Sequence, residues 1–323
     1  MELPAALRAA VDDMLSGEPL ASLQQAASRL SARYRSETLD GKMHLDAKLA
    51  IKAYLAARLP ATYAAVRTSF EATSERLPEF SPSSLLDVGA GPGTSFWAAT
   101  DCWPTIVHAT MIEASVPARE AGIRLAQEHA VAGRWISADA TSPLSGVVAA
   151  DLVTLAYVLD ELPANALGPL VARLWELTSQ CLIVIEPGTP AGWKRILAVR
   201  ETLIAAGAHI VAPCPHQNSC PISEPDWCHF SRRVARSRIH RLAKSGDVPW
   251  EDEKFIYVAA SRSPAPATGP RVIAPPRTGS GQVRLKLCMT NGEVDERLFT
   301  KRNGDAFREA RRADWGDTLS GAE

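Results

Sequence analysis

Residues 84–94 read SLLDVGAGPGT. The first five residues are largely apolar, which predicts a buried strand, and glycine then stands at every second position. Glycine adopts backbone angles that a side chain forbids, and it lets a ligand approach the main chain closely. Residues 94–99 are compatible with a helix. A strand, a glycine turn and a helix N-terminus predict a nucleotide-type pocket at the carboxyl edge of a parallel sheet.

The spacing of the glycines distinguishes between cofactor classes. A dinucleotide fingerprint requires G-x-G-x-x-G, whereas the glycines here are Gly89, Gly91 and Gly93, and Thr94 stands where the third glycine would be. Asp87 precedes the first glycine by two residues, and its carboxylate suits the ammonium group of S-adenosylmethionine (SAM) better than a pyrophosphate. The D-x-G-x-G-x-G pattern resembles the SAM loop of class I methyltransferases. The alternative is a glycine-rich turn without a ligand.

Further pocket residues are expected where later strands end. Glu113 lies about 20 residues beyond the glycine loop, where an acid can accept hydrogen bonds from ribose hydroxyls. Asp139 and Ala140 follow the third strand, on the adenine side. Tyr157 ends the fourth strand at the pocket mouth, with an ordinary core tyrosine as the alternative. The predicted cofactor-binding set is Asp87, Gly89, Gly91, Gly93, Glu113, Asp139, Ala140 and Tyr157.

Composition sets limits on the class of protein. The 323 residues are 46% hydrophobic, which is enough for one sizeable core, and the formal net charge is -1. The chain is therefore no basic nucleic-acid coat, and RNA contacts must come from a local patch. No run of about 18 apolar residues is present, so no membrane span is expected. Because no secretory or transit-like leader is visible, we expect a cytoplasmic location, and we expect a monomer.

The order of patterns along the chain divides it into four parts. Helical spacing predicts an N-terminal helical region over residues 1–82, with a break at Pro60. Residues 83–262 alternate strand and helix, which predicts a parallel sheet covered on both faces. A Pro-rich linker over 263–276 leads to a small β-containing module over 277–323. The expected strands of the main domain lie near 84–89, 106–112, 133–137, 151–157, 181–186 and 255–260.

A cysteine-rich insertion over residues 211–230 is the second informative stretch. Cys214, Cys220 and Cys228 lie among several prolines, so we expect them on loops. Zinc sites usually show C-x2-4-C pairs. The gaps here are wider and suit an iron–sulfur cluster held by thiolates, with zinc and unligated cysteines as alternatives. Cys288 is the best candidate for a fourth ligand, and His216 and His229 are the substitutes.

A basic run follows the insertion directly. Its residues show partly helical spacing and no acid stands between them, which favours contact with RNA phosphates over a solvated helix face. The predicted RNA-binding residues are Arg232, Arg233, Arg236, Arg241 and Lys244.

Several segments together resemble the Rsm22 family, in a bacterial-type form. The matching residues are 60–65, the glycine loop 86–94, 186–189, 214–216, 226–230, 251–255 and 315–317. The glycine motif is common to many methyltransferases. The cysteine segment joined to the E-D-E-K-F segment is far more specific.

The resemblance implies a class I methyltransferase fold that acts on the small ribosomal subunit and its rRNA. It also implies a bound SAM and a [4Fe–4S] cluster on Cys214, Cys220, Cys228 and Cys288. Two functions follow, a SAM-dependent rRNA methyltransferase or a non-catalytic factor for assembly of the small subunit. No Asn-Pro-Pro-Tyr motif and no cysteine placed as a pyrimidine nucleophile is present, so no catalytic residue is predicted.

Overall fold

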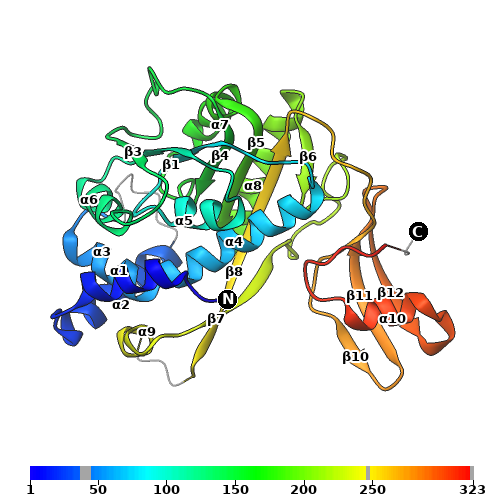
Figure 1. The fold of residues 1–323 in the computed structure, drawn as a ribbon. Coiled ribbons are helices and arrows are strands. Elements are labelled where there is room, and N and C mark those ends of the chain that lie inside the picture. The colour runs from blue at the N-terminus through cyan, green and yellow to red at the C-terminus, as the bar shows by residue number, and fades with distance from the viewer. Residues whose placement is uncertain (37–44, 245–247, 321–323) are drawn as a thin grey trace.

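The computed structural model describes residues 1–36, 45–244 and 248–320. A mixed sheet of eight strands forms the centre of the main domain (Figure 1). Its strand order is β3-β2-β1-β4-β5-β8-β6, and β7 pairs with one end of β8. The strands are β1 (Ser84–Val88), β2 (His108–Ile112), β3 (Gly133–Ile136), β4 (Ala150–Ala156), β5 (Thr178–Pro187), β6 (His209–Ala212), β7 (Phe230–Ala235) and β8 (Trp250–Ser261).

The first five strands run parallel, and β8 pairs antiparallel with β5 and β6. The apolar runs of β1, β4 and β5 are buried almost throughout, as expected for strands that are covered on both faces. Together with the glycine loop after β1, this arrangement is that of a class I methyltransferase-like fold. All six strands expected from the sequence are present.

The helices that cover this sheet form two groups: α4 (Leu59–Arg76) packs on α5 (Thr94–Cys102), and α7 (Leu167–Glu176) packs on α8 (Pro190–Ala205). Both α8 and α6 (Val116–Leu125) begin at a side-chain cap followed by proline. Ser115 accepts from the Ala118 N–H and Thr189 accepts from the Gly192 N–H. A short 3₁₀ turn, η1 (Ala164–Ala166), precedes α7.

The N-terminal region is helical, as the spacing predicts. It contains α1 (Ala5–Leu15), α2 (Leu20–Ser36), α3 (Lys48–Ala57) and α4. Pro60 lies in the first turn of α4, where the absent N–H costs nothing, so one helix ends and another begins there. These helices join the main core, since α3 also contacts α6 and α4 contacts β7 and β8.

The basic run does not form the expected helical stripe. Arg232, Arg233 and Arg236 lie on β7 or directly after it, and the helix α9 (Arg238–Ala243) begins later. The prediction of helical spacing was wrong because pairing with β8 decides the conformation of this segment. The strand β6 was also missed, since its four residues carry too little pattern to identify.

A small module follows the main domain (Figure 1). Its sheet contains β9 (Arg271–Val272), β10 (Arg277–Gly279), β11 (Gln282–Cys288) and β12 (Val294–Thr300), and η2 (Lys301–Asn303) and α10 (Asp305–Arg312) complete it. Asn291-Gly292 turns the chain between β11 and β12, with φ +90° at Gly292. Residues 271–272 of the expected linker pair with β11, so the module begins before residue 277.

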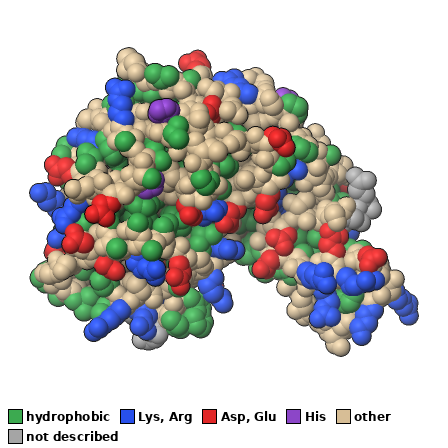
Figure 2. All heavy atoms as spheres, viewed as in Figure 1, with side chains coloured by type: hydrophobic (Ala, Val, Ile, Leu, Met, Phe, Trp, Pro, Cys, Tyr) green, Lys and Arg blue, Asp and Glu red, His purple; other side chains and the backbone are tan. Residues whose placement is uncertain are grey.

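The module has an apolar core of its own, which includes Val283, Leu285, Phe299 and Phe307. Lys and Arg side chains gather on the face of the module that Figure 2 shows. In the part of the chain that the structure describes, no helix is both long and apolar enough to cross a membrane.

Candidate cofactor pocket and cysteine cavity

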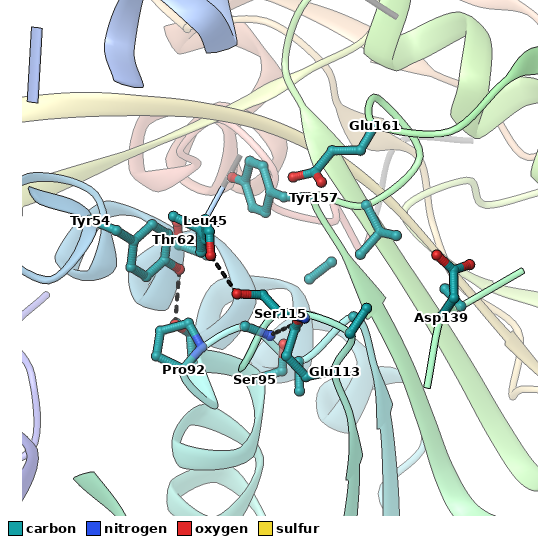
Figure 3. A pocket seen from close by; sticks show the side chains of 18 of the residues that line it. Leu45, Tyr54, Thr62, Pro92, Ser95, Glu113, Ser115, Asp139, Tyr157 and Glu161 are labelled. Carbon is teal, nitrogen blue, oxygen red and sulfur yellow. Dashed lines mark hydrogen bonds between the residues drawn. The ribbon is translucent and has the colours of Figure 1, made fainter. Parts of the chain in front are cut away.

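A pocket opens at the carboxyl ends of β1, β2 and β4, above the glycine loop (Figure 3). Six of the eight predicted cofactor residues line it: Gly89, Gly91, Glu113, Asp139, Ala140 and Tyr157. Of the other two, Asp87 is buried beneath the loop and Gly93 caps the start of α5. Segments far apart in the sequence therefore meet at one edge of the sheet, as the fold prediction requires.

The glycines of the loop are required by the backbone. Gly89, Gly91 and Gly93 have φ angles of +68°, +54° and +85°. At Gly89 a Cβ atom would lie 2.3 Å from a methyl carbon of Val158, so no larger residue fits. At Gly91 the nearest atom to a Cβ would be 3.8 Å away, which leaves the main chain open to the pocket.

Glu113 organises the floor of the pocket. Its carboxylate accepts hydrogen bonds from the Gly91 N–H at 2.7 Å and from the Ser115 N–H at 2.6 Å. Burial raises the pKa of Glu113, and the two N–H donors oppose this shift. Because each carboxylate oxygen has a second lone pair, the group can also accept from a ligand hydroxyl.

Asp87 supports the loop from below. Only 1% of its surface is exposed, and its Oδ1 accepts from the Thr154 hydroxyl at 2.7 Å. Burial raises the pKa of Asp87 to about 7, although hydrogen bonds from Thr154 and Ser95 oppose the shift. The carboxyl group therefore titrates near neutral pH, beneath the position where a ligand would lie.

Tyr157 lies at the pocket mouth with φ +58°, which is unusual for a residue with a side chain. Its hydroxyl donates to Glu253 Oε1 at 3.3 Å, and Arg58 forms a bidentate pair with Glu253 at 2.8 and 3.1 Å. Burial, and next the charge of Glu253, raise the pKa of Tyr157 well above its usual value. The hydroxyl therefore stays protonated and acts as a donor.

Sequence reasoning missed the wall that the N-terminal helices supply. Tyr54 of α3, Thr62 of α4 and Arg58 between the two helices line the pocket. The Tyr54 hydroxyl lies 2.9 Å from Thr94 Oγ1 (Figure 3). Glu161 lines the pocket from the segment after β4. No local motif marks these residues, because only tertiary packing brings the helices to the sheet edge.

Glu186 ends β5 close to the segment that follows β4. It is fully buried, and it accepts from the Leu159 N–H at 3.1 Å and the Arg195 guanidinium at 2.7 Å. Burial, reinforced by the nearby charge of Asp160, raises the pKa of Glu186 to about 8. These two contacts hold the segment that follows β4 and carries Glu161.

The four predicted cysteine ligands line one cavity next to α8 and β8. Cys214 and Cys220 come from the loop after β6, Cys228 precedes β7, and Cys288 ends β11 of the module. All four are free thiols. The pKa of Cys228 is raised well above its usual value, by burial and then by the three neighbouring thiols. The cavity therefore joins cysteines that are 74 residues apart in the sequence, from Cys214 to Cys288.

The two histidines that were considered as alternative fourth ligands lie in different cavities. His216 lines the cysteine cavity, and its Nε2 lies 3.4 Å from Cys288 Sγ, whereas His229 lines a different cavity. Arg200 is buried at the cysteine cavity and donates to the carbonyls of His216 and Asn218, which fixes the loop. Within residues 1–36, 45–244 and 248–320, no three metal-binding side chains converge closely enough to hold a single metal ion.

Comparison with known proteins identifies the family. Residues 48–320 match the family described as mitochondrial small ribosomal subunit Rsm22. The chain belongs to the Rsm22 family.

Two kinds of curated relatives resemble this Rsm22-family chain. Human mitochondrial ribosome assembly protein METTL17 is 30% identical over 289 residues, which cover 82% of the chain and 61% of the relative. Mitochondrial Rsm22-cox11 tandem protein 2 of Schizosaccharomyces pombe is 25% identical, over 72% of the chain and 38% of the relative. The chain therefore spans less than two thirds of the length of both.

Solved structures show a general likeness to this Rsm22-family chain. An O-methyltransferase family protein from Burkholderia thailandensis is 13% identical, with a TM-score of 0.45 and coverage of 77% of this chain and 74% of the other. Magnesium protoporphyrin IX methyltransferase from Synechocystis PCC 6803 with bound SAH is also 13% identical, with a TM-score of 0.42 and coverage of 73% and 95%.

The basic residues of this Rsm22-family chain meet acids from β8. Arg233 pairs with Asp252 at 2.8 Å, and Arg236 and Lys244 pair with Glu251 at 3.0 and 2.6 Å. The sequence showed no compensating acid because the partners lie across the sheet rather than along the run. Arg232 and Arg241 are exposed and make no ion pair with any residue that the structure describes.

Proposed function

We propose that this chain binds SAM above its glycine loop and methylates rRNA of the small ribosomal subunit, with a [4Fe–4S] cluster joining its two parts. The observation that carries the proposal is the pocket at the edge of β1, β2 and β4 in a member of the Rsm22 family. The family description and the name of the human relative refer to the ribosome, which supports the choice of partner.

The residues of the pocket fit SAM. The open main chain at Gly91 suits the close approach of the cofactor, and Glu113 suits the ribose hydroxyls. Asp139 and Ala140 would face the adenine end, and Tyr157 the mouth. Bound SAM would supply an electrophilic methyl group, and the chain would hold an rRNA nucleophile in line with it.

The residues of the cysteine cavity fit a cluster. Four free thiols without a nearby carboxylate surround an almost entirely apolar space, and four thiolates are the usual ligand set of [4Fe–4S]. A single zinc ion would need the thiols to converge on one point. A cluster separates its ligands more widely, which supports it over zinc. Four cysteines leave no iron open, so we assign the cluster a structural role.

A non-catalytic role in subunit assembly is the second candidate. The human relative is named a ribosome assembly protein. Tyr157 is held as a donor to Glu253, and Glu186 is engaged by Arg195. In this case, SAM would stabilise the fold without turnover. The relatives named above are mitochondrial, so the expected cytoplasmic location stays a prediction, as does the monomeric state.

Mass spectrometry of small-subunit rRNA separates the two candidates. Cells that lack the protein would be compared with cells that express the wild type or Gly91→Arg. A methyl group that is absent in the deletion strain, restored by the wild type and not by the variant supports the methyltransferase. Unchanged rRNA together with defective subunit assembly would exclude methyl transfer and leave the assembly role.

A further inference from the structure

A third cavity lies where the cysteine-rich segment meets the module, separate from the SAM pocket and from the cysteine cavity. It measures about 290 Å³. Three half-buried aromatic rings line it, Trp227 and His229 from the main domain and Trp315 from the module. Three charged side chains also line it, Asp226, Lys254 and Lys286. No part of the proposed methyl transfer uses these residues.

The rings are held in fixed positions. The indole Nε1 of Trp227 donates to the Gly188 carbonyl at 3.0 Å. His229 stacks on Trp227 with ring centroids 5.2 Å apart and an interplanar angle of 18°. Trp315 meets His229 edge to face, with centroids 4.9 Å apart. The cavity wall therefore presents a rigid aromatic surface that needs little reorganisation to bind a ligand.

The turn that carries Trp315 is tied down on both sides. The Gly316 N–H donates to the Val272 carbonyl at 2.9 Å, and the Arg271 guanidinium donates to the Gly316 carbonyl at 2.6 Å. Gly316 has φ +103°, and a Cβ atom there would lie 3.4 Å from the ring of Phe230. The module therefore contributes Trp315 from a defined position against the main domain.

The charges around the rings suit a nucleotide. Lys254 is exposed and makes no ion pair within the described parts of the chain, so its ammonium is available to a phosphate. Lys286 pairs with Asp226, whose carboxylate can accept from the exocyclic amine of a base. Aromatic rings beside one available cation form the usual platform for an unpaired base.

We propose that this cavity binds one unpaired nucleobase of single-stranded RNA, with the adjacent phosphate at Lys254. This inference rests on the proposed function, in which the chain acts on rRNA. A duplex would not enter, because its bases are stacked and paired, and rings inside a cavity need a base that is turned out.

The test measures RNA binding by the full chain, purified anaerobically. A fluorescent single-stranded oligonucleotide of mixed sequence is titrated at several salt concentrations, beside a duplex of the same sequence and a free mononucleotide. Trp315→Ala should weaken single-strand binding about ten- to a hundredfold, and Trp315→Phe should restore most of it. Lys254→Gln, which leaves the rings intact, should weaken binding and lower the salt slope by about one.

Controls separate this inference from the proposed function. Each variant should keep its thermal midpoint, its SAM affinity and its iron content. Equal affinity of the wild type, Trp315→Ala and Lys254→Gln would overturn the inference, as would equal binding of duplex and single strand or tight binding of the mononucleotide alone. If the wild type sediments with small subunits while these variants bind RNA unchanged, only this inference fails. A wild type that binds neither RNA nor subunits would overturn both.

Discussion

Gly91 tests the pocket at the scale of one residue. Its φ is +54° and its main chain is open to the pocket, so Gly91→Arg would fill the site where SAM is expected. We expect SAM binding to weaken at least about a hundredfold by isothermal titration, because the side chain and the cofactor compete for one volume. Gly207→Arg is the matched control: φ there is +78°, nothing lies within 4 Å, and the residue is outside the pocket. Equal loss in both variants would mean that backbone strain, not the pocket, is responsible.

Asp87 makes the stability of the fold depend on pH. Its pKa is raised from 3.8 to about 7 by burial, so the native state binds the proton more tightly than the unfolded state. Stability from this group is present below pH 4 and is lost as pH rises towards about 7. Asp87→Asn lacks this loss. In urea unfolding, the free energy of unfolding of the variant should therefore rise relative to that of the wild type between pH 5 and pH 8. A difference between the two free energies that does not change with pH would contradict the assignment.

At the scale of elements, β7 and β8 decide what the basic run can do. Arg232 is exposed without an ion pair among the described residues, whereas Arg236 is half-buried and paired with Glu251. We expect Arg232→Ala to weaken RNA binding and lower the salt slope by about one. Arg236→Ala should instead destabilise the fold by about 1–3 kcal/mol, since Glu251 loses a partner. Salt-dependent RNA titration and urea unfolding of both variants distinguish the roles, and the reverse result would refute them.

An element could be predicted from the sequence where neighbouring residues determine its conformation, and not where distant residues do. The strand and glycine loop at 84–94 could be predicted, because neighbouring residues alone determine them: an apolar run forms the strand and glycines allow the positive φ angles. The position of Glu113 in the pocket could be predicted from the number of residues that separate it from the glycine loop. Arg58 and Tyr54 could not, because they reach the pocket only through helix packing. The strand β7 was missed for the same reason, since its pairing with β8 outweighs the spacing of its arginines.

At the scale of the whole molecule, Cys288 connects the module to the main domain. It ends β11, and the other three thiols of the cavity belong to the main domain. We expect Cys288→Ser to lower the iron content and to speed proteolysis between residues 263 and 270, because the proposed cluster would no longer fix the module. Cys102→Ser, outside the cavity, should change neither. Unaltered iron and cleavage in Cys288→Ser would exclude Cys288 as a ligand.

The proposed function requires that Cys288 and the three cysteines of the main domain share one iron–sulfur cluster. Anomalous diffraction at the iron edge, from crystals of the anaerobically purified chain, tests it most directly. We expect one iron peak among Cys214, Cys220, Cys228 and Cys288. A zinc signal there, or no metal with Cys288 apart from the other three thiols, would contradict it.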